Sequence, residues 1–273
     1  IQVGIHTYYT SQQLTKNFEM FTPEEFAQYR REAVRANNPG GKDYSSDEIN
    51  FGGSAAAPEY INYKAGNFAD WEKIMMRTAI TNSNTINISG GNEVTKIFSS
   101  LNYFTQTGLL PNSDYKRGAF RLNLNRKINR KIDVDMNLSL ATDGQQRESS
   151  SLDFITISPF MGPYDLNGNL VFRLAGANAS SSTINPLWNI REANNESKSS
   201  YYNLNLAGNY AITKTLSYRL NTLYNRKFME DGTYRTRLHS EGIATNGTAT
   251  LTNSAWEEFL VENILNFSPV INN

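Results

Sequence analysis

The chain has 273 residues, and its 26 lysines and arginines balance 26 aspartates and glutamates, so its formal net charge at pH 7 is +0. This balance provides no basic stripe of the kind that binds nucleic acid. The absence of cysteine excludes disulfide frameworks, thiolate metal ligands and a cysteine nucleophile, and no apolar run approaches the roughly 18 residues of a membrane-spanning helix.

The first expected element in chain order is a strand over about residues 1–10, where apolar and polar residues alternate. A long polar segment follows to about residue 82, and it contains one clear helix. Thr22 is a suitable N-cap, Pro23 occupies the first helical position, and Glu25 completes a capping box. This helix is expected to end in the Asn-, Pro- and Gly-rich segment 37–41. A second helical turn is expected over 70–75. Loop packing is the simpler role for both helices, and binding is the alternative.

Seven further strands are expected, joined alternately by short turns and by long loops. The short turns are expected near 90–92, 127–130 and 213–215, and the longest connections are 11–82, 143–199 and 230–254. Such asymmetry is typical of outer-membrane barrels, which have short periplasmic turns and long extracellular loops. The strands themselves are expected at about 85–89, 96–106, 117–126, 131–141, 202–212, 216–229 and 259–267.

The segment 131–141 shows the strand pattern most clearly, because every second residue is apolar and the residues between are polar. Ten residues at about 3.4 Å each, tilted by about 45°, span roughly 24 Å, which is the height of the apolar band of a bilayer. We therefore expect an all-β fold, an antiparallel transmembrane β-barrel with lipid outside and water inside. The side chains expected to face lipid are Leu122, Val134, Leu138, Leu204 and Leu220.

Both ends of the chain lie beside expected strands, at Ile1 and Asn273. This position favours a partial barrel, with about eight strands of a larger barrel wall. Its long extracellular loops would carry the short helices.

Four segments resemble one family. The run NISGGNEVTKIFSSLNYF at 87–104 resembles the S-G-G-x-E-x-T-K-Y-x-x-S-x-x-Y segment of SusC/RagA-type TonB-dependent transporters, and GLLPNSDYKR at 108–117 resembles their G-I-x-x-N-S-D-Y-x-R. Asp70-Trp71 ahead of Arg77-Thr78-Ala79 is similar to their D-W-x-D-x-x-x-R-T-A stretch. Residues 158–169 are similar to their S-P-x-x-P-x-Y-D-x-x-G-N loop, so the resemblance is collinear over nearly the whole chain.

This resemblance implies a barrel of about 22 strands, plugged by a separate N-terminal domain. Residues 1–273 would be part of the barrel domain, with the plug and the TonB-contacting segment upstream. Such proteins import glycan fragments or oligopeptides across the outer membrane of Bacteroidota. A SusD-like surface lipoprotein caps the mouth and TonB supplies the energy, and no cofactor is implied.

Capture of substrate at the outer mouth predicts contacts from the long loops, through aromatic and amide side chains that stack on sugars or bond to hydroxyl and peptide groups. Neutral loops rich in asparagine and tyrosine favour neutral glycans, and oligopeptides remain open. For Trp188 the alternative is that it packs its own loop after Pro186. The candidate contacts are Tyr164, Asn185, Trp188 and Arg191.

Enzymatic and metal sites have almost no support in the sequence. The two histidines, His6 and His239, lack the spacing to an acid and a nucleophile that catalysis needs. The segment 165–169 looks like a partial Ca²⁺ loop but lacks the later glutamate, so a β-turn is preferred. A water-filled lumen explains Asp133 and Asp135. The alternatives to an importer are a passive or adhesive outer-membrane barrel and a soluble glycan-binding β-domain.

Overall fold

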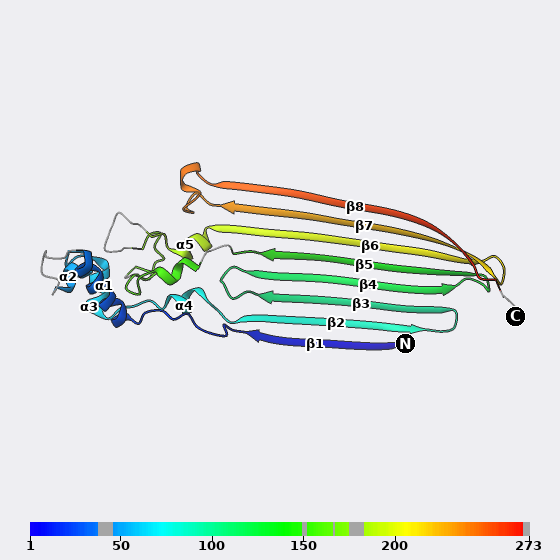
Figure 1. Ribbon diagram of the computed structural model, residues 1–273, viewed down its shortest axis with the longest axis horizontal. Coiled ribbons are helices and arrows are strands. Elements are labelled where there is room, and N and C mark those ends of the chain that lie inside the picture. The colour runs from blue at the N-terminus through cyan, green and yellow to red at the C-terminus, as the bar shows by residue number, and fades with distance from the viewer. Residues whose placement is uncertain (38–45, 149–151, 166, 175–182, 270–273) are drawn as a thin grey trace.

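The protein is built on one antiparallel sheet of eight strands, as the computed structural model shows for residues 1–37, 46–148, 152–165, 167–174 and 183–269 (Figure 1). All strands pair in sequence order, which confirms the all-β antiparallel prediction. The sheet is open over these residues, with β1 and β8 at its two edges. The strands are β1 Gln2–Gln12, β2 Ala79–Gly91, β3 Thr95–Thr107, β4 Asp114–Lys127, β5 Ile132–Gln146, β6 Ala193–Ala211, β7 Leu216–Arg235 and β8 Thr248–Phe267.

Several strands are longer than the sequence predicted, so the ends of the expected loops were wrong. β6 begins at Ala193 and not near residue 202, and β8 begins at Thr248 and not near residue 259. The β6 extension is polar on both faces, as in the run NNESKSS at 194–200, so it shows no alternation that could reveal a strand. The β8 extension does contain apolar residues, such as Leu251 and Trp256, and it was assigned to a loop instead. Ladder pairing with neighbouring strands continues through them. The long connections are therefore 13–78, 147–192 and 236–247.

Each short turn is closed by one side-chain oxygen that accepts two backbone N–H groups. Asn92 accepts from Val94 and Thr95 at 2.9 and 2.8 Å. Asn129 accepts from Lys131 and Ile132 at 2.8 and 3.0 Å. Thr213 does the same for Thr215 and Leu216, at 3.2 and 3.0 Å. These are the local bonds that favour Asn and Thr in turns.

The predicted helix is α1, Pro23–Asn37, and its capping box is present. The Thr22 backbone N–H donates to Glu25 at 2.8 Å, and the Glu25 N–H donates to the Thr22 hydroxyl at 3.3 Å. The predicted second turn is α4, Trp71–Met75. The helix end was expected over 37–41; α1 ends at Asn37, and residues 38–41 lie outside the described residues. Elements that were not predicted are α2 Asp47–Asn50, α3 Pro58–Ala65, α5 Pro186–Arg191 and the 3₁₀ turns Leu152–Thr156 and Ile243–Thr245.

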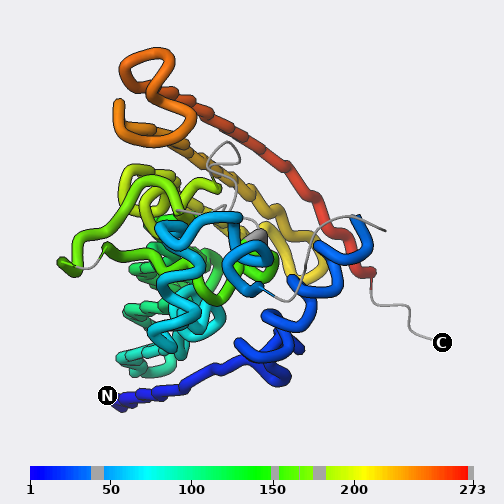
Figure 2. Tube along the Cα trace, turned by 90° about the vertical axis from the view of Figure 1, so that its left-hand side faces the viewer, coloured from blue at the N-terminus to red at the C-terminus, as the bar shows by residue number. Residues whose placement is uncertain are grey.

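All the helices lie at the end of the sheet opposite the three short turns (Figure 1). Figure 2 looks onto this end, with the helical segments in front of a sheet that curves from β1 to β8. Within the described ranges, no helix has both the length and the apolar character needed to cross a membrane.

The hydrogen-bonding register sorts the side chains onto two faces, because directly paired residues point the same way. Leu122, Leu138 and Leu204 form one row, and Val134 and Leu220 flank Gly208 in another row on the same side. The prediction that these five share one face is confirmed. We call this the apolar face. The other, here called the polar face, carries a row of amides at Asn123, Asn137 and Asn205.

The apolar side chains form a band that runs obliquely to the rows of paired residues. The row that contains Ile86, Leu101 and Phe120 ends in two charged residues, Arg226 and Glu257. On β7 and β8 most apolar residues of this face lie nearer the short turns, at Leu216, Leu220, Phe259, Val261, Leu265 and Phe267, while Phe228 and Leu251 lie beyond the charged pair. The band therefore makes an angle with the strands, which is the geometry of strands tilted across an apolar layer.

Candidate functional site

The helical end is held together by the segments that carried the family resemblance. The Trp71 indole is fully buried and donates to the Met161 carbonyl at 3.0 Å. Two residues before it, the Ala69 N–H donates to the Pro159 carbonyl at 2.7 Å. These bonds join two segments about ninety residues apart in sequence, around the buried cluster Trp71, Met75, Phe154, Ile157, Leu174 and Ile190.

A second apolar cluster lies under α1, α2 and α3. Phe51 is fully buried and stacks on Tyr63 with ring centroids 4.5 Å apart, and the Phe160 ring meets both edge-on. Asn62 donates its amide to the Phe160 carbonyl at 2.8 Å. Residues 158–161 thus contribute to both clusters, and they make the helical end one packed unit.

An ion pair fastens α1 to α2 and α3. The Arg31 guanidinium donates to both carboxylate oxygens of Asp47, at 2.8 and 3.0 Å. The Tyr63 hydroxyl accepts from Arg31 at 2.8 Å and donates to Asp47 at 3.0 Å. The hydrogen bonds from Arg31 hold the pKa of Asp47 at about 2, below its usual 3.8. The same bonds raise the pKa of Arg31, and burial raises that of Tyr63.

Of the four predicted substrate contacts, Asn185 lies where it cannot touch a bound molecule in this conformation. Its side chain has no exposed surface. It caps α5 by accepting from the Leu187 N–H at 3.1 Å, and its amide donates to the carbonyls of Pro163 and Val171 at 2.9 and 2.7 Å. Asn185 therefore positions the loop around it.

The other three predicted residues remain accessible. Trp188 is half-buried on α5, and its indole N–H donates to the Leu238 carbonyl at 2.9 Å. The Arg191 guanidinium carbon lies 4.2 Å from the centroid of a Trp188 ring, while a 2.9 Å ion pair joins Arg191 to Glu192. Tyr164 follows Pro163 and is 56% exposed. Trp188 thus fastens its loop to 236–247, as the packing alternative proposed, and remains partly exposed.

The other polar motifs have structural roles. Asp165 accepts from the N–H groups of Asn167 and Asn169, at 2.9 and 2.8 Å, so it closes a turn as expected. His239 is buried and its Nδ1 accepts from the Glu241 N–H at 3.0 Å. Burial, with Arg235 nearby, lowers the pKa of His239. No cluster of three or more histidine, aspartate or glutamate side chains among the described residues could hold a metal ion.

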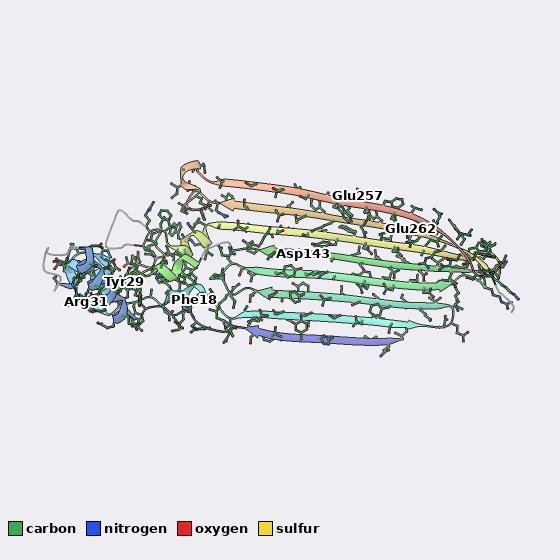
Figure 3. All side chains as sticks on the ribbon, viewed as in Figure 1. Phe18, Tyr29, Arg31, Asp143, Glu257 and Glu262 are labelled. Atoms are coloured by element: carbon green, nitrogen blue, oxygen red, sulfur yellow. The ribbon has the colours of Figure 1, made fainter. Side chains whose placement is uncertain are left out.

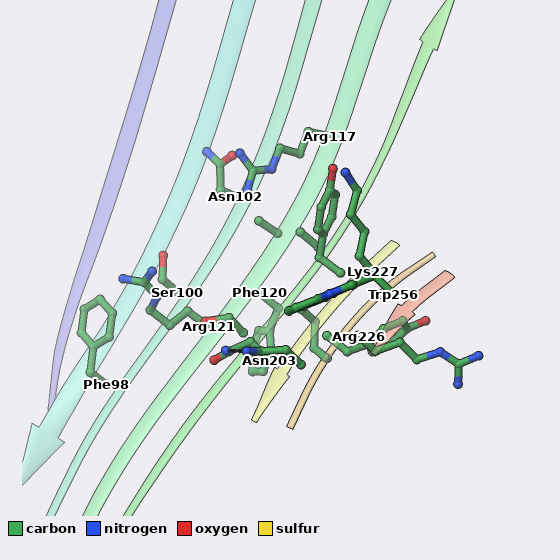
Figure 4. Close-up of a pocket in the computed structure, with 17 residues that line it drawn as sticks. Phe98, Ser100, Asn102, Arg117, Phe120, Arg121, Asn203, Arg226, Lys227 and Trp256 are labelled. Atoms are coloured by element: carbon green, nitrogen blue, oxygen red, sulfur yellow. Dashed lines mark hydrogen bonds between the residues drawn. The ribbon is translucent and has the colours of Figure 1, made fainter. Parts of the chain in front are cut away.

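The polar face of the sheet contains a hollow of about 530 Å³ that the sequence did not indicate as a site (Figure 4). Arg117 and Arg121 enter it from β4, and Lys227 enters from β7. Two aromatic side chains, Tyr201 and Trp256, join them from β6 and β8. Three amides, Asn102, Asn203 and Asn225, are also part of its lining.

Closer to the short turns, the same face is occupied by amides and acids that bond to one another. Asn205 donates to Asn221 at 2.9 Å, and Asn221 donates to Glu262 at 2.8 Å. Asp135 accepts from Asn125 at 2.6 Å and lies 3.8 Å from Arg219. Figure 3 shows Glu262 and Asp143 along the strands, far from the helical end that carries Arg31. The expectation that Asp133 and Asp135 point to the wet face agrees with the register.

Alternation places Arg117, Arg121, Tyr201, Lys227 and Trp256 on the polar face, but only the register brings them together. The short turns could have predicted the register between β4 and β5 and between β6 and β7. The connection 147–192 separates β5 from β6, and no rule of turn length sets the register across so long a loop. For this reason Arg121 and Tyr201 could not be placed together from the sequence.

Comparisons with known proteins agree with the resemblance in the motifs. No family model matches the chain. The TonB-dependent receptor P3 of Formosa agariphila is 21% identical over 276 residues, which cover 97% of this chain and 25% of that protein. The chain is similar to a TonB-dependent transporter of the SusC/RagA type. It spans about a quarter of the length of that curated relative.

Solved structures show the same fold. The RagAB peptide transporter matches 86% of this chain with a TM-score of 0.68 and 21% identity, over 29% of its own chain. The RagAB peptide importer in the closed-closed state matches 99% of this chain with a TM-score of 0.76 and 19% identity, over 33% of its own chain. The eight-stranded sheet and its helical end are therefore an arrangement found within larger transporters.

Proposed function

We propose that this chain forms part of the barrel wall and outer mouth of an outer-membrane importer of the SusC type. The observation that carries the proposal is the oblique apolar band on one face of the sheet. On β5 it runs from Ile132 to Leu140, about 27 Å along the strand and about 21 Å when tilted by 40°, close to the roughly 25 Å apolar band of such barrels.

The two ends of the sheet support an orientation with the helical end outside. The short turns around Asn92, Asn129 and Thr213 suit the periplasmic side, and the packed helical unit suits the extracellular mouth. Single cysteines in the full-length protein test this in intact cells. An impermeant maleimide should label Ser54→Cys and spare Arg130→Cys. Labelling of position 130 but not of position 54 would reverse the orientation, and labelling of both in a soluble protein would support the soluble β-domain.

The cargo in this proposal is an oligopeptide or a glycan fragment, and a SusD-like surface lipoprotein closes the mouth. Energy comes from TonB through a segment upstream of this chain. The similarity to a TonB-dependent receptor supports the role of TonB, and the similarity to the RagAB peptide transporter supports peptide cargo and a partner protein; the glycan alternative rests on the sequence resemblance. Substrate contacts are proposed for Tyr164, Trp188 and Arg191, and a positioning role is proposed for Asn185.

Uptake by a strain that carries the full-length gene tests the transport itself. Fluorescent oligopeptides and oligosaccharides should enter cells that express the protein, and entry should cease in a deletion strain and in a strain without TonB. Entry that continues without TonB would favour a passive pore. A protein at the cell surface with no uptake of either class would favour an adhesive barrel.

A further inference from the structure

The hollow on the polar face holds an excess of positive charge. Arg117, Arg121 and Lys227 line it, and none of them forms an ion pair within 4.0 Å inside the described ranges of the chain. Arg219 on the same face does have such a partner, since it lies 3.8 Å from Asp135. Two acids lie beside these cations. Asp143 is directly opposite Arg117 in the register, and Glu258 accepts from Asn225 of the lining at 2.8 Å, so together they offset two of the three positive charges.

Aromatic and amide groups surround these cations. The Lys227 ammonium lies 5.3 Å from the centre of the Tyr201 ring, and Trp256 is paired with Lys227 in the register. Figure 4 shows Lys227 and Trp256 on one side of the hollow and Arg117 and Arg121, from β4, on the other. Flat aromatic faces bind sugar rings or apolar side chains, and amides bond to hydroxyl or peptide groups.

The two arginines are spaced to meet two separated units of an extended molecule. They are four residues apart on β4, which places their backbones about 14 Å apart on one face. Each guanidinium can hold a carboxylate with two parallel hydrogen bonds. The site thus fits a chain-like ligand with more than one carboxylate better than a neutral one.

We propose that this hollow binds carboxylate-bearing oligomers and gives the importer a preference for anionic cargo. The proposal deepens the proposed function and rests on it for the identity of the hollow as part of a transport path. It differs from the sequence-based expectation of neutral glycans, which considered the loops alone. The carboxylates could belong to an acidic peptide or to a uronic-acid glycan, because both offer the same group to the arginines.

Two matched pairs of probes separate the effect of the carboxylates from the effect of the molecule that bears them, a glycan or a peptide. One pair is a trimer of galacturonic acid and its methyl ester, and the other is an oligopeptide with two aspartates and its asparagine counterpart. Affinities are measured with the purified full-length protein in detergent, at low and high salt. The acid member of at least one pair should bind about tenfold more tightly than its neutral partner, and salt should weaken this preference. The pair that shows it identifies the carrier.

Variants of the lining residues then test whether the preference for acidic probes arises in the hollow. The double variant Arg117→Gln/Arg121→Gln should abolish the preference while it leaves affinity for the neutral probe within about twofold. Lys96→Gln removes an exposed cation from the same face outside the hollow and should change nothing. Arg121→Lys, which keeps the charge, serves if the double variant does not fold, and it should retain a reduced, salt-sensitive preference.

Equal affinity for both members of both pairs would overturn the proposal. Equal loss of acidic and neutral probes in the double variant would also overturn it, since that result would mean that the arginines contact other parts of the protein. Because binding is measured without transport, a charge-selective hollow in a protein that imports nothing would refute the proposed function and leave this inference standing.

Discussion

Arg77 and Asp114 are joined by an ion pair of 3.1 Å across 37 positions of the sequence. The same guanidinium donates to the carbonyls of Gly108 and Ser113 at 2.9 and 3.0 Å. Its backbone N–H donates to the Leu109 carbonyl at 2.8 Å. One side chain from the R-T-A segment therefore holds the G-L-L-P-N-S-D loop, and this contact joins two of the segments that carry the resemblance.

Replacement of Arg77 should loosen that loop. Arg77→Ala removes three hydrogen bonds, and because the side chain is 38% exposed we expect a local loss of only about 1–2 kcal/mol. Arg77→Lys keeps the charge but cannot reach all three acceptors, so it should be intermediate. Hydrogen exchange of residues 108–113 measures the effect, with the exposed Lys73→Ala as the control. Unchanged protection in Arg77→Ala would show that the loop orders itself.

The Arg31–Asp47 pair should make the helical unit sensitive to acid. Folding lowers the pKa of Asp47 from 3.8 to about 2. The stabilisation is therefore complete above about pH 4, and it is lost as the pH falls through about 2. Hydrogen exchange of α1–α3, corrected for intrinsic rates, should show constant protection from pH 7 to 4 and a decline below that.

A variant isolates the contribution of the carboxylate. Asp47→Asn should reduce protection of α1–α3 at pH 7 by about 1–2 kcal/mol and should remove most of the acid dependence. Glu24→Gln is the matched control, because Glu24 lies 3.4 Å from the same guanidinium but is 80% exposed. Similar losses in both variants would mean that the overall charge, and not the Asp47 geometry, stabilises the helices.

Arginine on the two faces of β5 should have opposite consequences. Leu138→Arg places a charge on the apolar face and should cost about 2–4 kcal/mol of stability in a bilayer. Asn137→Arg, one residue away on the polar face, should be tolerated because that side chain is exposed. Unfolding of the full-length protein in lipid vesicles compares them. Equal sensitivity would indicate that the apolar face packs on protein.

Much of the sheet could be predicted because strong local signals coincide with it. Alternation over 131–141 identified both the strand and its faces, and short turns at Asn129 and Thr213 define hairpins. The extended end of β6 could not be found, because its residues are polar on both sides, whereas the start of β8 carries Leu251 and Trp256 and was missed. Their pairing is held by backbone bonds to neighbours, which leave no pattern in the side chains.

The predicted substrate contact at Asn185 shows a different limit of prediction from sequence. Asparagine at 185 was selected as an exposed amide, but it precedes Pro186 at the start of α5. An N-cap residue followed by proline is a recognised helix start, and this signal could have identified its structural role. Its contacts with Pro163 and Val171 depend on how distant parts of the loop fold together, so they could not be predicted.

The roles of Asn185 and Tyr164 can be separated by experiment. Asn185→Ala removes the α5 cap and leaves the carbonyls of Pro163 and Val171 without their donor, so the loop should lose about 1–3 kcal/mol. Asn185→Asp keeps the cap acceptor and should lose less. Tyr164→Ala alters an exposed side chain and should leave the loop ordered.

Hydrogen exchange over 163–174 and uptake of labelled cargo are both measured. If Tyr164 contacts cargo, Tyr164→Ala should lower uptake while the protection of the loop from hydrogen exchange stays normal. If Asn185 acts only by positioning the loop, its variants should lower uptake in proportion to the protection that the loop loses. Reduced uptake in Asn185→Ala with full protection would restore Asn185 as a direct contact.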